Sequence, residues 1–284
     1  MRLSPSPLAL LLLSACADKG ADTADSGPTQ ATSYQLNWWT DPSPAVAGEA
    51  AELYLQILDQ DGAPVENLQQ NHQRMDHILV ISQDLSSFEH RHHEDHYEVT
   101  ADTLREATFH TPETFPYSGR FLIAIDFASA NLYQQLSDVV EVEGDLPQLD
   151  APEVDLSTTV STGEVTAEFT WEIPAIAGLE SVLWAHLSDA DGAPIADLTQ
   201  WLGADAHLAI VKDDLSWVGH THAYVEGMDS APPGHTMPAV WTGPDVPFHV
   251  IAEYPGTYKA WLQFTREGAP DDPYTVPFMF EVSP

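Results

Sequence analysis

Six histidines occupy matching places in two copies of one sequence pattern. Each copy consists of a histidine, six further residues, Asp-Leu-Ser, three residues and His-x-His. The copies lie 130 residues apart and contain His77, His90 and His92, then His207, His220 and His222. Only six of the sixteen positions are identical, and three of those six are the histidines. Because the imidazoles persist where their surroundings differ, the pattern indicates chemistry rather than packing.

Each copy predicts a β-hairpin that gathers three imidazoles on one face. An apolar run follows His77 and His207, and Asp-Leu-Ser supplies a turn in which Asp or Ser accepts backbone hydrogen bonds. With that turn near residues 84 and 85, His77 lies opposite His92 and Leu79 opposite His90, and alternate side chains share a face. Opposed Cβ atoms lie roughly 4.5 to 5.5 Å apart, so three rings can bind one ion at roughly 2.0 to 2.1 Å. We therefore expect up to two transition-metal ions per chain.

The residue types around the histidines favour copper, with zinc as the alternative. Imidazole suits both metals, and thioether sulfur favours Cu(I). Met75 precedes His77 by two residues, and Met237 follows His235 by two in a segment found only in the second copy, although methionine is also an ordinary core residue. The further candidate ligands are Met75, His93, His96, His110, His235, Met237 and His249.

Four of these candidates have two possible roles each. His93 and His96 could form a second, looser site in the first copy, or they could simply belong to a polar hairpin end. His110 and His249 each follow a phenylalanine, and each could complete a fourth ligand position or be a partly buried, hydrogen-bonded histidine. If Phe109-His110 and Phe248-His249 are equivalent, the second copy is longer by about nine residues.

The N-terminus resembles the signal of a bacterial lipoprotein. Arg2 precedes an apolar stretch that ends in Leu13-Ser14-Ala15-Cys16. The resemblance implies cleavage before Cys16 and lipidation of this residue, so residues 1–15 are a signal peptide and are too short to span a bilayer. Residues 16–33 then form a lipidated, acidic and flexible tether. Cys16 is the only cysteine, which excludes an intrachain disulfide and a free thiolate ligand.

The same resemblance predicts where the protein resides. Residue 17 is alanine and not the aspartate of the inner-membrane retention rule, so we expect the outer membrane, with the folded part facing the periplasm or the cell surface. Contact with the membrane is expected through the lipid alone. The formal charge of −35 arises from 44 acidic and 9 basic residues and argues against nucleic acid and against adhesion to anionic lipid. Acidity of this extent also serves solubility.

The two copies lie within longer repeats. Asp-Gly-Ala-Pro occurs at residues 61–64 and again at 191–194, displaced by the same 130 residues. Most segments are short strand candidates bounded by Gly, Pro or Asp, and no long capped helical pattern is present. We expect an all-β chain with two tandem β-sandwich domains related by internal duplication, at residues 34–143 and 154–284, with an acidic linker at residues 144–153.

The central part of each repeat resembles exported bacterial domains of the YtkA-like type. The shared features are the His-led strand, Asp-Leu-Ser, His-x-His and a Phe-rich strand after an aromatic-Gly turn. More loosely, the repeats are similar to immunoglobulin-like periplasmic copper-binding proteins. The resemblance implies immunoglobulin-like β-sandwiches and an association with metal, often copper. Here His93 and Ala223 follow the His-x-His elements, where the family commonly has proline.

Three functions are compatible with these features. The first is a lipid-anchored, extracytoplasmic metal-binding protein that buffers copper or delivers it to an unidentified partner. The second is an adhesive tandem module that binds a protein or a glycan. The third is a metalloenzyme, since three histidines with an open position resemble catalytic zinc, with Glu94 or Asp95 as a nearby base. No acid and base recur in both copies, and no Gly-x-Ser-x-Gly elbow or phosphate loop occurs, so we expect a protein that is not an enzyme.

Overall fold

The computed structural model describes residues 34–71, 73–130, 132–147, 150, 153–223 and 242–284. The signal peptide, Cys16, the tether, His235 and Met237 lie outside these residues. The described part is almost entirely β-structure, with a short helix α1 (Ala101–Glu106) and a 3-10 turn η1 (His93–Asp95). None of the helices in this part is long and apolar enough to cross a bilayer.

The N-terminal domain is a sandwich of two antiparallel sheets. One sheet has the order β1 (Gln35–Asp41), β2 (Ala51–Leu58) and β6 (Thr108–Glu113). The other has the order β5 (Phe88–Arg91), β4 (Asp76–Ser82), β7 (Gly119–Ser129) and β8 (Leu132–Val142), and the short β3 (Leu68–Gln69) pairs with the end of β7. These orders correspond to strands A-B-E and C′-C-F-G of an immunoglobulin-like sandwich.

The C-terminal domain repeats this arrangement. Its outer sheet has the order β9 (Thr159–Ser161), β10 (Val165–Ile173), β11 (Ser181–Asp189) and β15 (Asp245–Val250). Its inner sheet has the order β14 (Val218–His222), β13 (His207–Lys212), β16 (Gly256–Arg266) and β17 (Ala269–Val282), with the short β12 (Leu198–Thr199) beside β16. The predicted all-β fold with two tandem immunoglobulin-like sandwiches is therefore confirmed.

The strand register corrects one part of the sequence alignment. Leu53 pairs with Thr111 in the N-terminal domain, and Leu183, 130 residues after Leu53, pairs with Phe248. Thr111 and Phe248 are therefore equivalent, with an offset of 137. The insertion in the second repeat amounts to seven residues, because 137 − 130 = 7, and not to nine. The expected match of Phe109-His110 with Phe248-His249 is wrong, since His110 corresponds to Pro247 in the paired strands.

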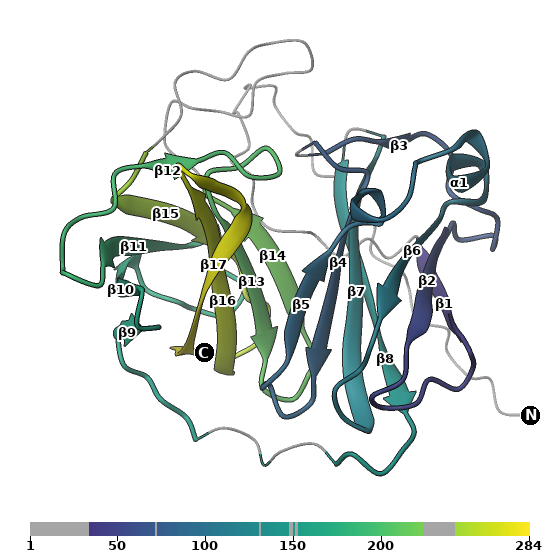
Figure 1. The fold of residues 1–284 in the computed structure, drawn as a ribbon, viewed down its shortest axis with the longest axis horizontal. Helices are drawn as coiled ribbons and strands as arrows, with labels where there is room; N and C mark the ends of the chain where they lie inside the picture. Colours follow the sequence, from purple (N-terminus) through teal and green to yellow (C-terminus); the bar gives the residue numbers. More distant parts are fainter. Residues whose placement is uncertain (1–33, 72, 131, 148–149, 151–152, 224–241) are drawn as a thin grey trace, which may run out of the picture.

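The four sheets stack as successive layers. Figure 1 shows β4 and β5 beside β13 and β14 in the centre, with β1 and β2 on one side and β10 and β11 on the other. On β4, Ile78 and Val80 belong to the core of the N-terminal sandwich, whereas Leu79 and Ile81 belong to a third apolar core shared with the other domain. Both faces of this strand are buried, so its sequence is a continuous apolar run rather than an alternating one.

The third core joins the two inner sheets. Its buried members are Leu79, Ile81, Leu85, Leu122 and Ala124 from the N-terminal domain and Ala209, Val211, Leu215, Val218 and Trp261 from the C-terminal domain. The rings of Phe88 and Trp261 stack at 4.6 Å with an interplanar angle of 11°. Lys259 donates a hydrogen bond of 2.8 Å to the carbonyl of Leu85. The domains are thus packed through one continuous face.

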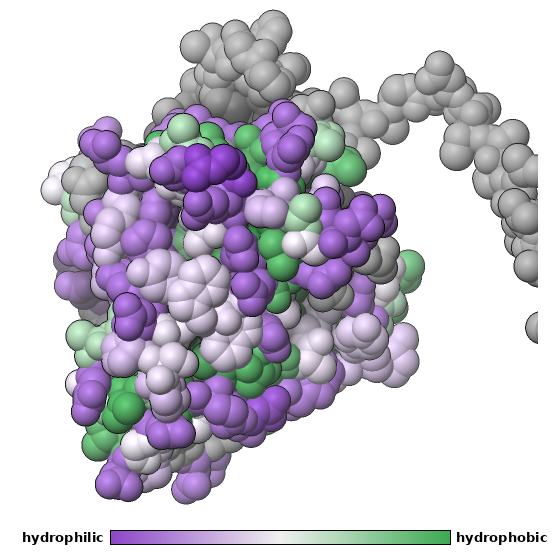
Figure 2. All heavy atoms as spheres, turned by 90° about the vertical axis from the view of Figure 1, so that its right-hand side faces the viewer, coloured by the Kyte–Doolittle hydropathy of each residue, from purple (hydrophilic) through white to green (hydrophobic). Residues whose placement is uncertain are grey.

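The outer sheets show the opposite pattern. On β2, buried side chains alternate with partly exposed ones, as expected of a sheet with one face towards solvent. Figure 2 looks onto the side of the molecule formed by the N-terminal domain, where hydrophilic residues cover much of the surface and hydrophobic ones are scattered between them.

Candidate metal centre

The two hairpins form as the sequence predicts. Leu79 pairs with His90 in the first, and His207 pairs with His222 in the second. Asp84 accepts a backbone hydrogen bond of 3.0 Å from Ser86, and the Asp-Leu-Ser turn of the second hairpin makes the same 3.0 Å bond. The leucine of both turns has a φ of 61°. Asp-Leu-Ser is therefore a turn motif in both hairpins, and the histidines lie on the face that each hairpin turns towards the other domain.

The two histidine trios meet at the interface and form one cluster. The ring of His77 lies 5.1 Å from that of His220, 5.7 Å from that of His222 and 6.0 Å from that of His207. The ring of His90 lies 4.8 Å from that of His220. The two trios that the sequence predicts therefore do not lie apart in separate repeats but adjoin each other in one cluster. Sequence spacing within one repeat carries no information on how the repeats pack, which explains the difference.

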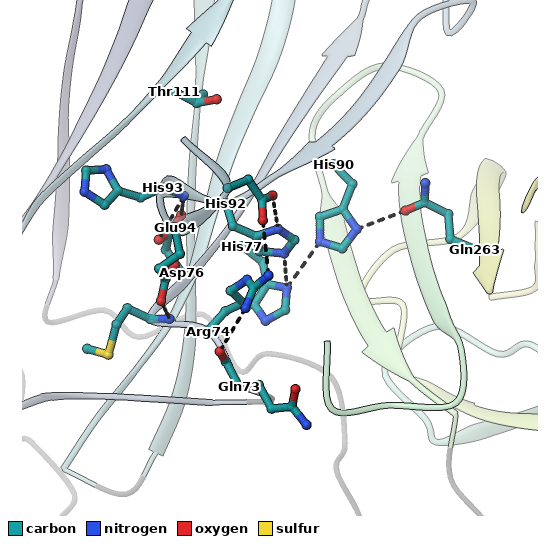
Figure 3. A network of polar contacts seen from close by, with 12 residues as sticks. Gln73, Arg74, Asp76, His77, His90, His92, His93, Glu94, Thr111 and Gln263 are labelled. Carbon is teal, nitrogen blue, oxygen red and sulfur yellow. Dashed lines mark hydrogen bonds and ion pairs between the residues drawn. The ribbon is translucent and has the colours of Figure 1, made fainter. Parts of the chain in front are cut away.

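Four of the six histidines bring ring nitrogens close enough to share an ion. One nitrogen each from His77, His90, His207 and His220 lies within 4.8 Å of the others. His92 belongs to the same cluster, since its Nε2 lies 3.1 Å from Nδ1 of His77. Figure 3 shows His77, His90 and His92 pointing towards one another. The exposed fraction of His77, His92, His207 and His220 is only 1%. This group could hold a metal ion shielded from solvent by both domains.

The outer nitrogens of two histidines bind residues of the opposite domain. His90 Nδ1 contacts Oε1 of Gln263 at 2.9 Å (Figure 3), and Gln263 in turn donates from Nε2 to Thr275. His220 Nδ1 contacts the carboxylate of Asp126 at 2.7 Å. Asp126 pairs with His77 across β4 and β7, and Gln263 pairs with His207 across β13 and β16. Asp126 and Gln263 thus occupy equivalent positions in the two repeats. Each orients a candidate ligand that belongs to the opposite repeat.

These outer partners determine which nitrogen of each ring carries hydrogen. Carboxylates and carbonyls only accept, so His220 donates from Nδ1 to Asp126, and His207 donates from Nε2 to the carbonyl of Trp201 at 2.9 Å. The remaining nitrogens, Nδ1 of His207 and Nε2 of His220, then both present lone pairs to one another at 3.3 Å. Two acceptors at this distance repel, whereas a cation between them is bound by both. Ligating histidines in proteins commonly donate their second N–H to a carboxylate or carbonyl in this way.

His92 has the same kind of outer partner. Its Nδ1 lies 2.8 Å from a carboxylate oxygen of Asp95, which leaves Nε2 directed into the cluster. Burial by itself would raise the pKa of Asp95, but the hydrogen bond from His92 and the nearby charge of Arg74 lower it to about 2. Asp95 is therefore a carboxylate at neutral pH and keeps the ring of His92 in the orientation that ligation requires.

Burial disfavours the charged form of three of these histidines. The pKa values of His77, His90 and His220 lie well below the ordinary histidine value, first because the rings are removed from water and then because neighbouring imidazoles repel a second charge. Neutral imidazole is the form that binds metal ions. Nε2 of His77 is also buried without a hydrogen-bond partner among the described residues.

The structure places the other candidates of the first repeat away from the cluster. Met75 is partly buried and packs against the core of the N-terminal sandwich, which is the core role that methionine commonly has. His93 points away from His77 and His92 (Figure 3), and its Nδ1 accepts a hydrogen bond of 3.2 Å from the backbone of His110. His96 is exposed. His93 and His96 therefore lie outside the cluster.

His110 and His249 do not supply the fourth ligand. His110 lies on β6 of the outer sheet, 3.2 Å from Glu52, and His249 on β15 lies 2.7 Å from Glu180. Each is the hydrogen-bonded histidine of the alternative interpretation. Both histidines therefore lie outside the cluster, which the two hairpins form between the domains.

Sequence reasoning missed Asp126, Gln263 and Trp201. Two of them carried a detectable signal, because Asp126 interrupts the apolar strand Phe121–Phe127 and Gln263 interrupts Ala260–Phe264. A polar residue within a buried strand is uncommon without a specific partner. The backbone carbonyl of Trp201 carries no such signal.

Fold and site together define a class: tandem immunoglobulin-like domains with a buried histidine cluster between them. The chain belongs to the family described as Domain of unknown function (DUF8832), whose model matches residues 30–144 and 158–284. A comparison with curated proteins finds no match.

Solved structures that resemble this chain are distant in both sequence and overall superposition. One is a protein of Corynebacterium diphtheriae provisionally described as membrane-anchored (14% identity, TM-score 0.24, 89% of this chain and 59% of that one). A second is invasin, a bacterial integrin-binding protein (13% identity, TM-score 0.23, 86% and 39%), and a third is a chimeric titin tandem (12% identity, TM-score 0.20, 88% and 98%). The chain spans less than two thirds of the length of the first two.

Proposed function

We propose that this protein is a lipid-anchored, extracytoplasmic copper-binding protein that holds the metal in the histidine cluster between its domains. The observation that carries the proposal is that Nδ1 of His207 and Nε2 of His220 face each other with their lone pairs at 3.3 Å. Hydrogen bonds to Trp201 and Asp126 fix the two rings in this orientation. For an ion with bonds of roughly 2.0 to 2.1 Å, two ligands in tetrahedral positions are about 3.3 to 3.4 Å apart. The separation in the protein matches that value.

The donor set narrows the choice of metal. Met75 packs against the sandwich core, and the four residues that bring ligand atoms together are all histidines. Imidazole suits copper, zinc and nickel, whereas calcium and magnesium require oxygen. We propose copper, which the resemblance to exported copper-associated domains supports, and retain zinc as the alternative.

Burial of the cluster favours buffering over rapid delivery. An ion enclosed by His77, His207 and His220, which are all but inaccessible to solvent, leaves only when the domains separate or the rings turn. We therefore propose that the protein stores or buffers the metal without catalysis, and that release to a partner requires opening of the interface. The lipid on Cys16 and the acidic tether would hold both domains outside the cytoplasm.

Metal titration tests the proposal. The mature chain, prepared without a histidine tag, is titrated with Cu(II) and with Zn(II) by isothermal calorimetry. The double variant His207→Ala/His220→Ala should bind copper at least 10-fold to 100-fold more weakly than the parent. The matched control is His186→Ala/His249→Ala, because both of these histidines also pair with a carboxylate but lie outside the cluster. Equal affinity of the parent and the first variant would refute the assignment.

A further inference from the structure

We propose that the cluster takes two copper ions, one in each histidine trio, and that a small oxygen anion such as hydroxide bridges them. The proposal rests on the proposed function, because it assumes copper in the cluster, and it concerns how many ions bind and how they are coupled. The observation that carries it is that the imidazole rings have the same separations in both trios.

The trios have the same internal geometry. In the N-terminal trio the ring centroids of His77, His90 and His92 are separated by 5.4, 4.8 and 4.8 Å. In the C-terminal trio the corresponding separations among His207, His220 and His222 are again 5.4, 4.8 and 4.8 Å. The sequences between these histidines differ at most positions, yet the two hairpins hold the three rings at the same separations. Each trio thus offers three imidazoles at the same ring separations, which one ion in each trio would bind.

The nitrogen separations within a trio fit one ion. Nδ1 of His77 lies 3.2 Å from Nε2 of His90 and 3.1 Å from Nε2 of His92. In the other trio, Nδ1 of His207 lies 3.3 Å from Nε2 of His220. These values are close to the edge of a ligand triangle around an ion with bonds of roughly 2.0 to 2.1 Å. A single ion shared across the interface would instead take two nitrogens from each trio and leave His92 and His222 unused.

The pseudo-symmetry of the domains places the two units face to face. Asp126 of the N-terminal domain contacts His220, and the equivalent Gln263 of the C-terminal domain contacts His90. The cross-domain ring contacts are related in the same way, at 5.1 Å for His77 with His220 and 5.5 Å for His90 with His207. The open coordination positions of both ions would therefore face each other across the domain interface.

The positive charge of two neighbouring copper ions is the reason for proposing a bridging anion. Two cations held so close in a buried site repel each other strongly because the local dielectric is low. The carboxylate of Asp126, fully buried beside His220, and that of Asp95 beside His92 offset part of this charge. A hydroxide bound to both ions would offset more and would occupy the open position of each three-coordinate unit.

Stoichiometry and magnetism together test the proposal. Full-length mature protein is loaded with Cu(II), and copper per chain is measured by elemental analysis and native mass spectrometry. We expect two copper ions per chain and an electron paramagnetic resonance signal that integrates to much less than the total copper, because the bridge couples the spins. Acid denaturation should restore the full signal.

The outcomes are distinct. One ion per chain with a fully visible signal would overturn the pair and leave the proposed function intact. Two ions with a fully visible signal would overturn the bridge. Absence of bound copper would overturn both proposals.

Single-histidine variants supply a second measurement. His92→Ala should lower the copper content from two ions to one and make the remaining ion fully visible, and His222→Ala should do the same from the other side. The matched control is His96→Ala, which removes an exposed histidine four residues from His92. Should one variant fail to fold, the other and the copper–copper scattering of the parent by X-ray absorption decide the question; absence of that scattering contradicts the pair.

Discussion

His220 of the C-terminal domain donates its Nδ1 hydrogen to the carboxylate of Asp126 of the N-terminal domain, over 2.7 Å and with both side chains fully buried. Tyr133 donates a second hydrogen bond of 2.6 Å to the same carboxylate. A candidate ligand in one repeat is thus oriented by a residue of the other. The packing of the domains and the geometry of the candidate metal site consequently depend on each other.

Asp126→Asn is expected to weaken copper binding about 10-fold to 100-fold, the usual cost of losing an outer partner of a metal-bound histidine. The amide retains an acceptor oxygen but not the charge that strengthens His220 as a ligand. Calorimetric titration measures the change. Asp245→Asn is the matched control, because Asp245 also contacts a histidine, His186, at 2.7 Å, but on the exposed outer sheet. If the two variants bind copper equally well, Asp126 has no role in ligation.

The metal-free protein should lose stability as the pH falls below about 6.5. In the unfolded chain His77, His90 and His220 take up protons near that pH, whereas in the folded chain their pKa values are well below it. The free energy of unfolding is therefore highest above pH 6.5. It decreases as the pH falls from 6.5 towards the lowered pKa values, by up to about 4 kcal/mol per pH unit for three such groups. Thermal unfolding between pH 8 and pH 5 in the presence of a chelator measures this slope.

His77→Gln should show a shallower slope, because one of the three groups no longer titrates. A melting temperature of the parent that does not change over this range would contradict the assignment of neutral, buried imidazoles. The sequence alone would place proton competition for the metal near pH 6.5, the ordinary histidine value. The lowered pKa values move that competition in the folded protein to lower pH.

The sequence predicts those features that depend on local pattern. The Asp-Leu-Ser turns, the pairing of Leu79 with His90 and the shared face of each trio follow from strand alternation and hairpin geometry. The sequence does not predict that the two trios meet, because their meeting depends on how the two sandwiches pack. The continuous apolar runs of β4 and β13 were the available hint, since a strand buried on both faces needs a second layer. The sequence also left two roles open for Met75, and the structure places it against the sandwich core.

Cys16→Ser should release the protein from the membrane fraction. The apolar stretch before Cys16 is too short to span a bilayer, so the lipid is the expected anchor. Detergent phase partitioning of the two forms in a bacterial host measures the difference. Asp18→Ser, a change two residues away that leaves the cysteine in place, is the control. Equal retention of the parent and the cysteine variant in the membrane fraction would exclude the lipid anchor.

Trp261→Ala should weaken copper binding without removing a ligand. Trp261 is 4% exposed and stacks on Phe88 across the domain interface at 4.6 Å, so its loss leaves a cavity between the inner sheets. Truncation of a buried tryptophan costs about 3 to 5 kcal/mol, and here the loss falls on the contact that brings the two trios together.

Trp39→Ala provides the comparison, because Trp39 also stacks on an aromatic ring, Tyr54 at 5.0 Å, but on the outer sheet with 38% exposure. That change should cost about 1 kcal/mol and leave copper affinity unaltered. Equal copper affinity in both variants would show that the histidine cluster assembles independently of the apolar interface.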